Sequence, residues 1–164
     1  MNRIGMYCLL AVLIFGTASL SSGQTFNFTL DGLSEVPPNA SPATGFCTVL
    51  VDDPTDTVAV NCSYSGLLGP IAAAHIHAPA PPGVNAGVII PLTPTGGTTG
   101  TILLLPTFTS QTNIDNILAG LAYVNMHTQP FPGGEIRGQI TPEPASSMLI
   151  LAGVALLGLG RRRK

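Results

Sequence analysis

Proline and glycine recur so often between residues 24 and 141 that any helix or strand there must be short. The whole chain of 164 residues contains 15 prolines and 19 glycines, and valine and threonine are frequent between them. Short runs of β-branched residues bounded by turn formers are typical of strands rather than helices. The sequence therefore predicts an all-β domain with many turns.

Eight runs have the length and composition of strands. They cover residues 25–30, 45–51, 57–64, 71–77, 88–92, 101–105, 122–127 and 135–140. The segment 112–121 changes to a helical period, because one face would carry Ile114, Ile117, Leu118 and Leu121. Thr112 with Asp115 resembles a capping box. Eight short strands with one short helix predict a Greek-key sandwich.

The runs 45–51 and 57–64 are joined by residues 52–56, Asp-Asp-Pro-Thr-Asp, which favour a turn. In the resulting hairpin, Cys47 and Cys62 fall nearly opposite each other. Cys8 is the third cysteine and lies in the predicted export signal. An exported chain with two remaining cysteines favours a disulfide between them. Two reduced thiols in the core are the alternative.

Charge is distributed unevenly along the chain. Arg137 is the one basic residue between Asp31 and Glu143, a segment that holds all eight acidic residues and therefore carries a net charge of −7. Such a surface repels phosphate backbones, which argues against binding to nucleic acid.

The first 23 residues have the layout of a secretory signal peptide. Arg3 precedes an apolar run over residues 7–15, and small residues fill 17–23. The run is too short to span a bilayer, and Cys8 lies inside it, which argues against a lipoprotein anchor. We expect signal peptidase to cleave between Gly23 and Gln24.

Three segments follow one another at the C-terminus. They are the motif Pro142, Glu143, Pro144, an apolar stretch over residues 145–160, and the basic end Arg161, Arg162, Arg163, Lys164. A helix over 145–160 would reach roughly 24 Å, a marginal length for a bilayer core, with the basic end in the cytoplasm. This order resembles the PEP-CTERM sorting tail of Gram-negative bacteria.

The resemblance implies recognition by an exosortase-type enzyme, removal of the tail, and release to the cell surface or an extracellular polysaccharide matrix. Membrane association through residues 145–160 would then be transient. A permanent C-terminal membrane anchor is the alternative. The predicted organisation is a signal peptide over 1–23, one domain over 24–141 and a sorting tail over 142–164.

Two stretches hold all three histidines, AHIHAPAPPGV at 74–84 and AYVNMHTQPFPGGEIRGQI at 122–140. In their order and spacing they resemble the CHRD domain, first described in chordin and abundant in exported bacterial proteins. The resemblance covers nearly all of residues 24–141. It implies an immunoglobulin-like barrel similar to that of copper/zinc superoxide dismutases, without an established biochemical activity.

His75 and His77 are two residues apart on a predicted strand, so they face the same side. With His127 they form a candidate site for copper or zinc, ions that accept imidazole ligands. The superoxide dismutases use more than three histidines, which argues against that activity here.

The other interpretation of the histidines is a hydrogen-bonded cluster that fixes the loops. In it the imidazoles would bond to Asn125, Thr128 or Glu135. Arg137 would pair with Glu135, two residues away on the same strand face, or with another carboxylate. The sequence favours this structural interpretation over a metal site.

No nucleophile elbow and no carboxylate pair stands out in the sequence, so we predict no catalytic residue and no enzyme activity. The leading hypothesis is a cofactor-free surface or matrix module that binds another protein or a polysaccharide. The alternative is a copper- or zinc-binding module with weak redox activity.

Overall fold

The structure, a computed structural model, describes residues 23–142 of the chain. In chain order the elements are β1 Gln24–Asp31, β2 Thr44–Asp52, η1 Asp53–Thr55, β3 Thr57–Ser65, β4 Ile71–His77, β5 Val88–Leu92, β6 Pro94–Gly96, β7 Gly100–Phe108, α1 Gln111–Leu118, β8 Ala122–Thr128 and β9 Ile136–Ile140. The apolar runs of the predicted signal peptide and sorting tail lie outside the described residues. Within residues 23–142, no helix has the length and apolar character needed to cross a membrane.

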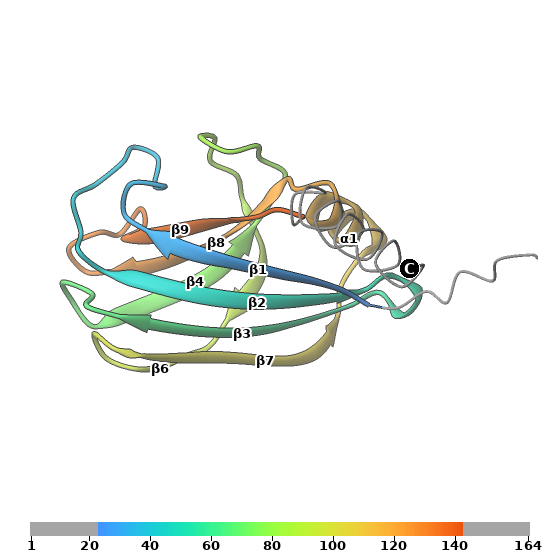
Figure 1. Cartoon of the computed structure of the whole chain (residues 1–164), viewed down its shortest axis with the longest axis horizontal. Helices are drawn as coiled ribbons and strands as arrows, with labels where there is room; N and C mark the ends of the chain where they lie inside the picture. Colours follow the sequence, from blue (N-terminus) through green and yellow to red (C-terminus); the bar gives the residue numbers. More distant parts are fainter. Residues whose placement is uncertain (1–22, 143–164) are drawn as a thin grey trace, which may run out of the picture.

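All nine strands belong to one antiparallel sheet, in the order β5-β4-β8-β9-β1-β2-β3-β7-β6. The sheet curls until β4 and β5 approach β6 and β7, so that it is nearly closed and its inner faces form two packed layers (Figure 1). The predicted all-β fold is confirmed. The two layers are halves of one wrapped sheet, which is why every central strand has hydrogen-bonded neighbours on both sides.

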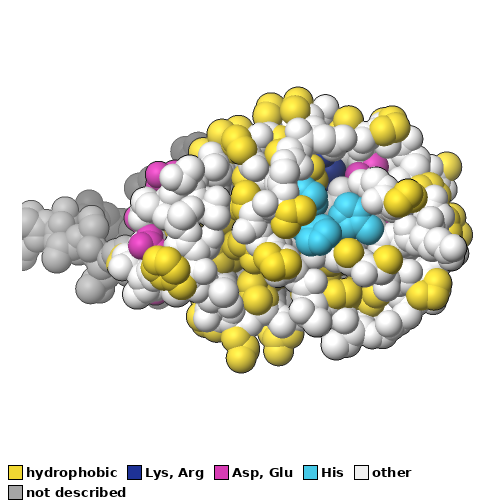
Figure 2. All heavy atoms as spheres, turned by 180° about the vertical axis from the view of Figure 1, so that it is seen from behind, with side chains coloured by type: hydrophobic (Ala, Val, Ile, Leu, Met, Phe, Trp, Pro, Cys, Tyr) yellow, Lys and Arg dark blue, Asp and Glu magenta, His cyan; other side chains and the backbone are white. Residues whose placement is uncertain are grey.

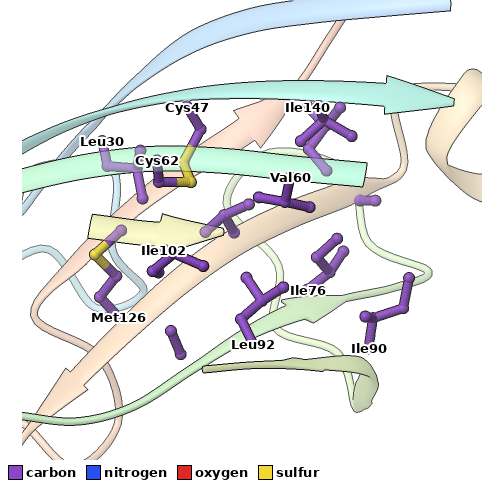
Figure 3. Packing of buried hydrophobic residues seen from close by; sticks show 14 of the residues in the cluster. Leu30, Cys47, Val60, Cys62, Ile76, Ile90, Leu92, Ile102, Met126 and Ile140 are labelled. Carbon is purple, nitrogen blue, oxygen red and sulfur yellow. A yellow bond between two sulfur atoms is a disulfide. The ribbon is translucent and has the colours of Figure 1, made fainter. Parts of the chain in front are cut away.

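Strict alternation of side chains builds the core. On β2, Cys47, Val49 and Val51 are buried, whereas Phe46 and Leu50, at alternate positions, are exposed. Residues from β3, β4, β7, β8 and β9 meet these side chains between the two layers (Figure 3). Each fully buried aliphatic side chain stabilises the fold by about 1.5–3 kcal/mol, so this apolar layer is the main source of stability.

The β2–β3 hairpin has the register that the turn sequence predicts. Cys47 lies directly opposite Cys62, and the two form a disulfide inside the core. The turn closes through a 3-10 helix at Asp53–Thr55, and Asp56 follows it with a left-handed φ of 52°. The predicted disulfide is confirmed.

Helix α1 differs from its prediction at both ends. Its N-cap is Ser110, whose hydroxyl accepts from the Asn113 N–H, so the predicted Thr112–Asp115 capping box was wrong. The helix ends at Leu118, and Gly120 with φ of 73° turns the chain into β8. Because Ile114 and Ile117 are fully buried, the helix closes one end of the barrel, as the apolar period predicted.

Strand β6 is the one strand that the sequence analysis missed among the described residues. Its three residues, Pro94–Gly96, have no alternating pattern of their own. They are a strand because Pro94, Thr95 and Gly96 pair with Ile102, Thr101 and Gly100 of β7. Such a short edge strand is defined by its partner rather than by its composition.

The outer face of β4, β8 and β9 is a second buried layer, and it is polar. Tyr123, Asn125 and Arg137 point away from the apolar core, yet loops cover them and leave each almost inaccessible to solvent. These loops span residues 32–43, 78–87 and 129–135. The candidate site lies in this polar layer.

Candidate metal centre

Strand alternation brings the three histidines to one place. On β4, Ala74 and Ile76 enter the core, so His75 and His77 face outward together. The neighbouring strand β8 pairs Ala73 with His127, which places the third imidazole beside the first. Figure 2 shows the histidine side chains grouped in a hollow of the molecular surface that is bordered by hydrophobic side chains.

The three imidazoles are close enough to share one ion. One ring nitrogen from each of His75, His77 and His127 lies within 4.8 Å of the other two. The Nδ1 atom of His75 is 3.1 Å from the Nε2 atom of His127. The ring centroids of His75 and His77 are 5.5 Å apart, and those of His77 and His127 are 5.9 Å apart.

Backbone carbonyls orient two of the rings. The Nδ1 atom of His77 is 3.0 Å from the Ala86 carbonyl oxygen, and that of His127 is 3.1 Å from the Pro132 carbonyl oxygen. A carbonyl only accepts, so both Nδ1 atoms carry the proton and both Nε2 atoms present a lone pair. Metal-binding histidines in proteins are held by the same kind of contact.

The Nε2 atom of His77 is the strongest sign of a ligand. It is buried and has no hydrogen-bond partner among the described residues, in a side chain that is 8% exposed. A buried nitrogen lone pair without a partner is unfavourable, and a bound cation would satisfy it. Zinc and copper both accept sets of imidazole nitrogens, so the residues fit such an ion.

The site keeps the imidazoles neutral. Burial lowers the pKa of His75, His77 and His127, and the charges of neighbouring groups lower the pKa of His77 and His127 further. The carbonyls of Ala86 and Pro132 act in the opposite direction. Since only neutral imidazole binds a metal ion, these shifts favour metal over proton near pH 7.

Glu135 and Thr128 are hydrogen-bonded to each other, and Glu135 also binds loop residues, but neither bonds to a histidine. The carboxylate of Glu135 accepts from Ser41 Oγ at 2.7 Å, from the Leu68 N–H at 2.7 Å and from Thr128 Oγ1 at 2.6 Å. It bonds to neither a histidine nor Arg137, so the predicted pairing of Glu135 with Arg137 was wrong. Glu135 instead ties three segments of the chain to the start of β9.

Arg137 and Asn125 belong to the polar layer beside the histidines. The Arg137 guanidinium lies over the ring of Tyr123, 3.4 Å from its centroid, and donates to the Val84 carbonyl and to Asn85 Oδ1. Asn125 Nδ2 donates to Glu35 Oε2 at 3.3 Å. Neither Asn125 nor Arg137 bonds to an imidazole, so the predicted hydrogen bonds from the histidines to the cluster were also wrong.

Glu35 was missed by the sequence analysis. It is buried in the loop that follows β1, and burial raises its pKa to about 7, against the opposing charge of Arg137. Its Oε1 atom and Asn125 Oδ1 have no hydrogen-bond partner among the described residues. No sequence pattern marks Glu35, because it stands in an irregular loop and approaches β8 only in the folded chain.

Comparison with known proteins gives two matches to family models. The model of the CHRD domain matches residues 26–140. The model of the PEP-CTERM protein-sorting motif matches residues 141–164. No curated protein and no solved structure matches the chain.

Proposed function

Because the chain belongs to the CHRD domain family and ends in a PEP-CTERM sorting motif, we propose that it is a surface-displayed module that binds copper or zinc. The sorting motif marks the chain as an exported, surface-associated protein processed by an exosortase-type enzyme. The three-histidine centre on the outer face of β4 and β8 would supply its binding activity.

One observation carries the metal proposal: the buried, unpartnered Nε2 atom of His77 lies beside nitrogens of His75 and His127. A purely structural histidine cluster would be expected to satisfy every buried ring nitrogen through neighbouring side chains. Here the carbonyls of Ala86 and Pro132 bind the Nδ1 atoms and leave Nε2 lone pairs at the centre of the group.

His75, His77 and His127 would hold the ion, and the Ala86 and Pro132 carbonyls would fix the rings of the last two. A zinc or copper ion with three protein nitrogens keeps a coordination position for an external ligand and acts there as a Lewis acid, or with copper as a redox centre. The proposal assigns a binding role and no catalytic residue.

A second candidate function is binding to a protein or polysaccharide without a metal. It is favoured by the outer face of β2, β3 and β7, where Leu50, Leu103 and Leu105 are exposed and line a groove of about 170 Å³. In this case the histidines would act as scaffold.

The test measures the metal content of the exported chain, purified without a histidine-containing tag, by elemental analysis and by titration with zinc and copper. We expect close to one ion per chain, and its loss in the variants His75→Ala and His127→Ala. Gln129→Ala, an exposed polar substitution two residues beyond His127, is the matched control and should bind like the wild type.

Failure of the wild type to bind either ion, even with excess metal, would reject the metal function. The histidines would then count as scaffold, and the exposed groove over β2, β3 and β7 would become the first surface to test for a partner. Metal binding that persists in both histidine variants would mean that the ion binds elsewhere on the protein, and it would reject the three-histidine site.

A further inference from the structure

Arg137 is a buried cation whose role the metal site alone does not explain. Its side chain is 1% exposed, and it is among the largest fully buried side chains of the described residues. Burying a guanidinium is unfavourable unless its donors and its charge are compensated. Arg137 directs its donors to the loop over residues 78–87 and to Gln139 Oε1, and its flat face to Tyr123.

The first compensation is a stack of three planar groups. The Arg137 guanidinium lies 3.4 Å from the Tyr123 ring centroid, and the His77 ring is parallel to that of Tyr123 within 4°, with centroids 4.9 Å apart. Strand β8, which carries Tyr123, lies between β9 with Arg137 and β4 with His77. The two neighbours therefore approach the tyrosine from opposite sides, and the ring of His77 is aligned through Tyr123.

The second compensation involves three consecutive residues of the loop. Arg137 Nη2 donates to the Val84 carbonyl at 2.9 Å, and Nη1 donates to Asn85 Oδ1 at 3.1 Å. The Ala86 N–H donates to Tyr123 Oη at 3.1 Å, while the Ala86 carbonyl accepts from His77 Nδ1 at 3.0 Å. Each member of the stack thus holds the same short stretch of loop.

Two contacts therefore orient the His77 ring: the Tyr123 ring stacks on its face, and the Ala86 carbonyl accepts from its Nδ1 atom. Both depend on Arg137, one through Tyr123 and the other through the position of Ala86. The Nε2 atom of His77 is the unpartnered ligand atom of the site. Its direction is therefore set from β9, on the far side of β8.

We propose that Arg137 is a positioning residue of the metal centre, which acts through Tyr123 and residues 84–86 to aim His77 Nε2 at His75 and His127. This inference rests on the proposed metal function. Lysine cannot replace arginine here, because an ammonium has no flat face to stack and no planar fork to reach two loop acceptors at once.

The first experiment compares zinc affinity and the absorption spectrum of bound cobalt in the wild type and in Arg137→Lys. The variant keeps the charge but loses the planar group. We expect affinity to fall by about 10- to 100-fold, the range found when partners that orient metal ligands are removed, with a shifted cobalt spectrum. Equal affinity and an unchanged spectrum in a folded Arg137→Lys would overturn the proposal.

Two further variants separate positioning from general loss of structure. Tyr123→Phe keeps the ring and loses the bond to Ala86, so its affinity should lie between those of the wild type and Arg137→Lys. If Arg137→Lys fails to fold, Tyr123→Phe still tests the proposal. Ser41→Ala removes a hydrogen bond to Glu135, which is bonded to no member of the stack, and should leave affinity and spectrum unchanged. A metal defect in Ser41→Ala equal to that of Tyr123→Phe would contradict a specific role of the stack.

A wild type without metal affinity would reject the proposed function, and the positioning role then has its own readout. In the metal-free protein, the Nδ1 proton of His77 should give a slowly exchanging NMR signal, because it is bonded to the Ala86 carbonyl. Arg137→Lys should accelerate its exchange at least tenfold. An equally protected proton in Arg137→Lys would overturn the positioning role, whatever the metal result.

Discussion

The Nδ1 atom of His75 donates a hydrogen bond to the Nε2 atom of His127 across 3.1 Å. The direction follows from the second nitrogen of His127, whose Nδ1 donates to the Pro132 carbonyl and leaves Nε2 as an acceptor. The Nε2 atom of His77 has no partner among the described residues, whereas the Nε2 atom of His127 accepts this hydrogen bond and the Nδ1 atom of His75 carries its proton. A metal ion that binds the Nδ1 atom of His75 would have to displace this proton.

The first prediction concerns this proton. In metal-free protein at pH 8, His75 should be the Nδ1–H tautomer, because His127 Nε2 is the only acceptor for its Nδ1 atom among the described residues. Zinc should convert it to the Nε2–H tautomer, if Nδ1 becomes the ligand. Long-range nitrogen–proton NMR correlations distinguish the two forms. An Nε2–H tautomer of His75 before zinc is added would contradict the assigned direction.

The second prediction concerns Glu35, whose pKa burial raises from 4.5 to about 7. The folded state binds this proton more tightly than the unfolded chain, so the contribution to stability is complete below pH 4.5 and disappears as the pH rises through 7. Glu35→Gln removes the ionisation and should be more stable than wild type at pH 8, by about 1 kcal/mol after allowance for solvent screening.

Urea unfolding at pH 5 and pH 8 measures this difference. The stability advantage of Glu35→Gln over the wild type should shrink or reverse at pH 5. At that pH the wild-type carboxyl is protonated and therefore uncharged, like the glutamine amide. Asp31→Asn is the matched control, because asparagine keeps an oxygen that accepts from the Ser34 N–H. A pH-independent difference between Glu35→Gln and wild type would show that Glu35 is not the titrating group.

The third prediction concerns the buried carboxylate of Glu135. Glu135→Ala would leave the Leu68 N–H and the hydroxyls of Ser41 and Thr128 without their acceptor, so we expect a loss of at least about 3 kcal/mol in unfolding free energy. Glu135→Gln should cost only about 1 kcal/mol, since its oxygen still accepts and the Thr128 hydroxyl can accept from its amide. Equal losses in the two variants would contradict this account.

The fourth prediction concerns the disulfide. Cys47 and Cys62 close a loop with a sequence separation of 15, for which loop closure alone stabilises by about 3 kcal/mol. The double variant Cys47→Ala and Cys62→Ala should lose about that much in urea unfolding. Wild type that has been reduced in denaturant and kept reduced is the control and should match it. An unchanged midpoint in the double variant would mean that the bridge adds no stability.

The local residue pattern predicted a strand and its bounds correctly where the residues of that strand and its flanking turns mark it. Strands β4 and β5 begin and end where the sequence predicted, and the turn over residues 52–56 fixed the register that pairs Cys47 with Cys62. In these segments the identity of each residue decides which face it occupies, and no distant contact is needed. The same rule placed His75 and His77 on one outer face.

Pattern failed where a distant part of the chain supplies the deciding contact. Strand β6 exists only as the partner of β7. The helix cap is a separate, local error: Ser110, two residues before Thr112, accepts from the Asn113 N–H. Glu135 and Arg137 are two residues apart, yet they do not pair: Glu135 binds Ser41 and Leu68, and Arg137 binds residues 84–85, all distant along the chain.

The sequence by itself determined the strand faces, the covalent bridge between Cys47 and Cys62 and the sorting motif, because each depends on neighbours along the chain. The tertiary structure alone decided that β8 lies between β4 and β9, which brings His127 beside His75 and stacks Arg137, Tyr123 and His77. The tertiary structure also decided which imidazole nitrogen has no hydrogen-bond partner among the described residues. The physical reason is that burial and hydrogen-bond direction depend on loops packed over the strands, and spacing along the chain does not encode that packing.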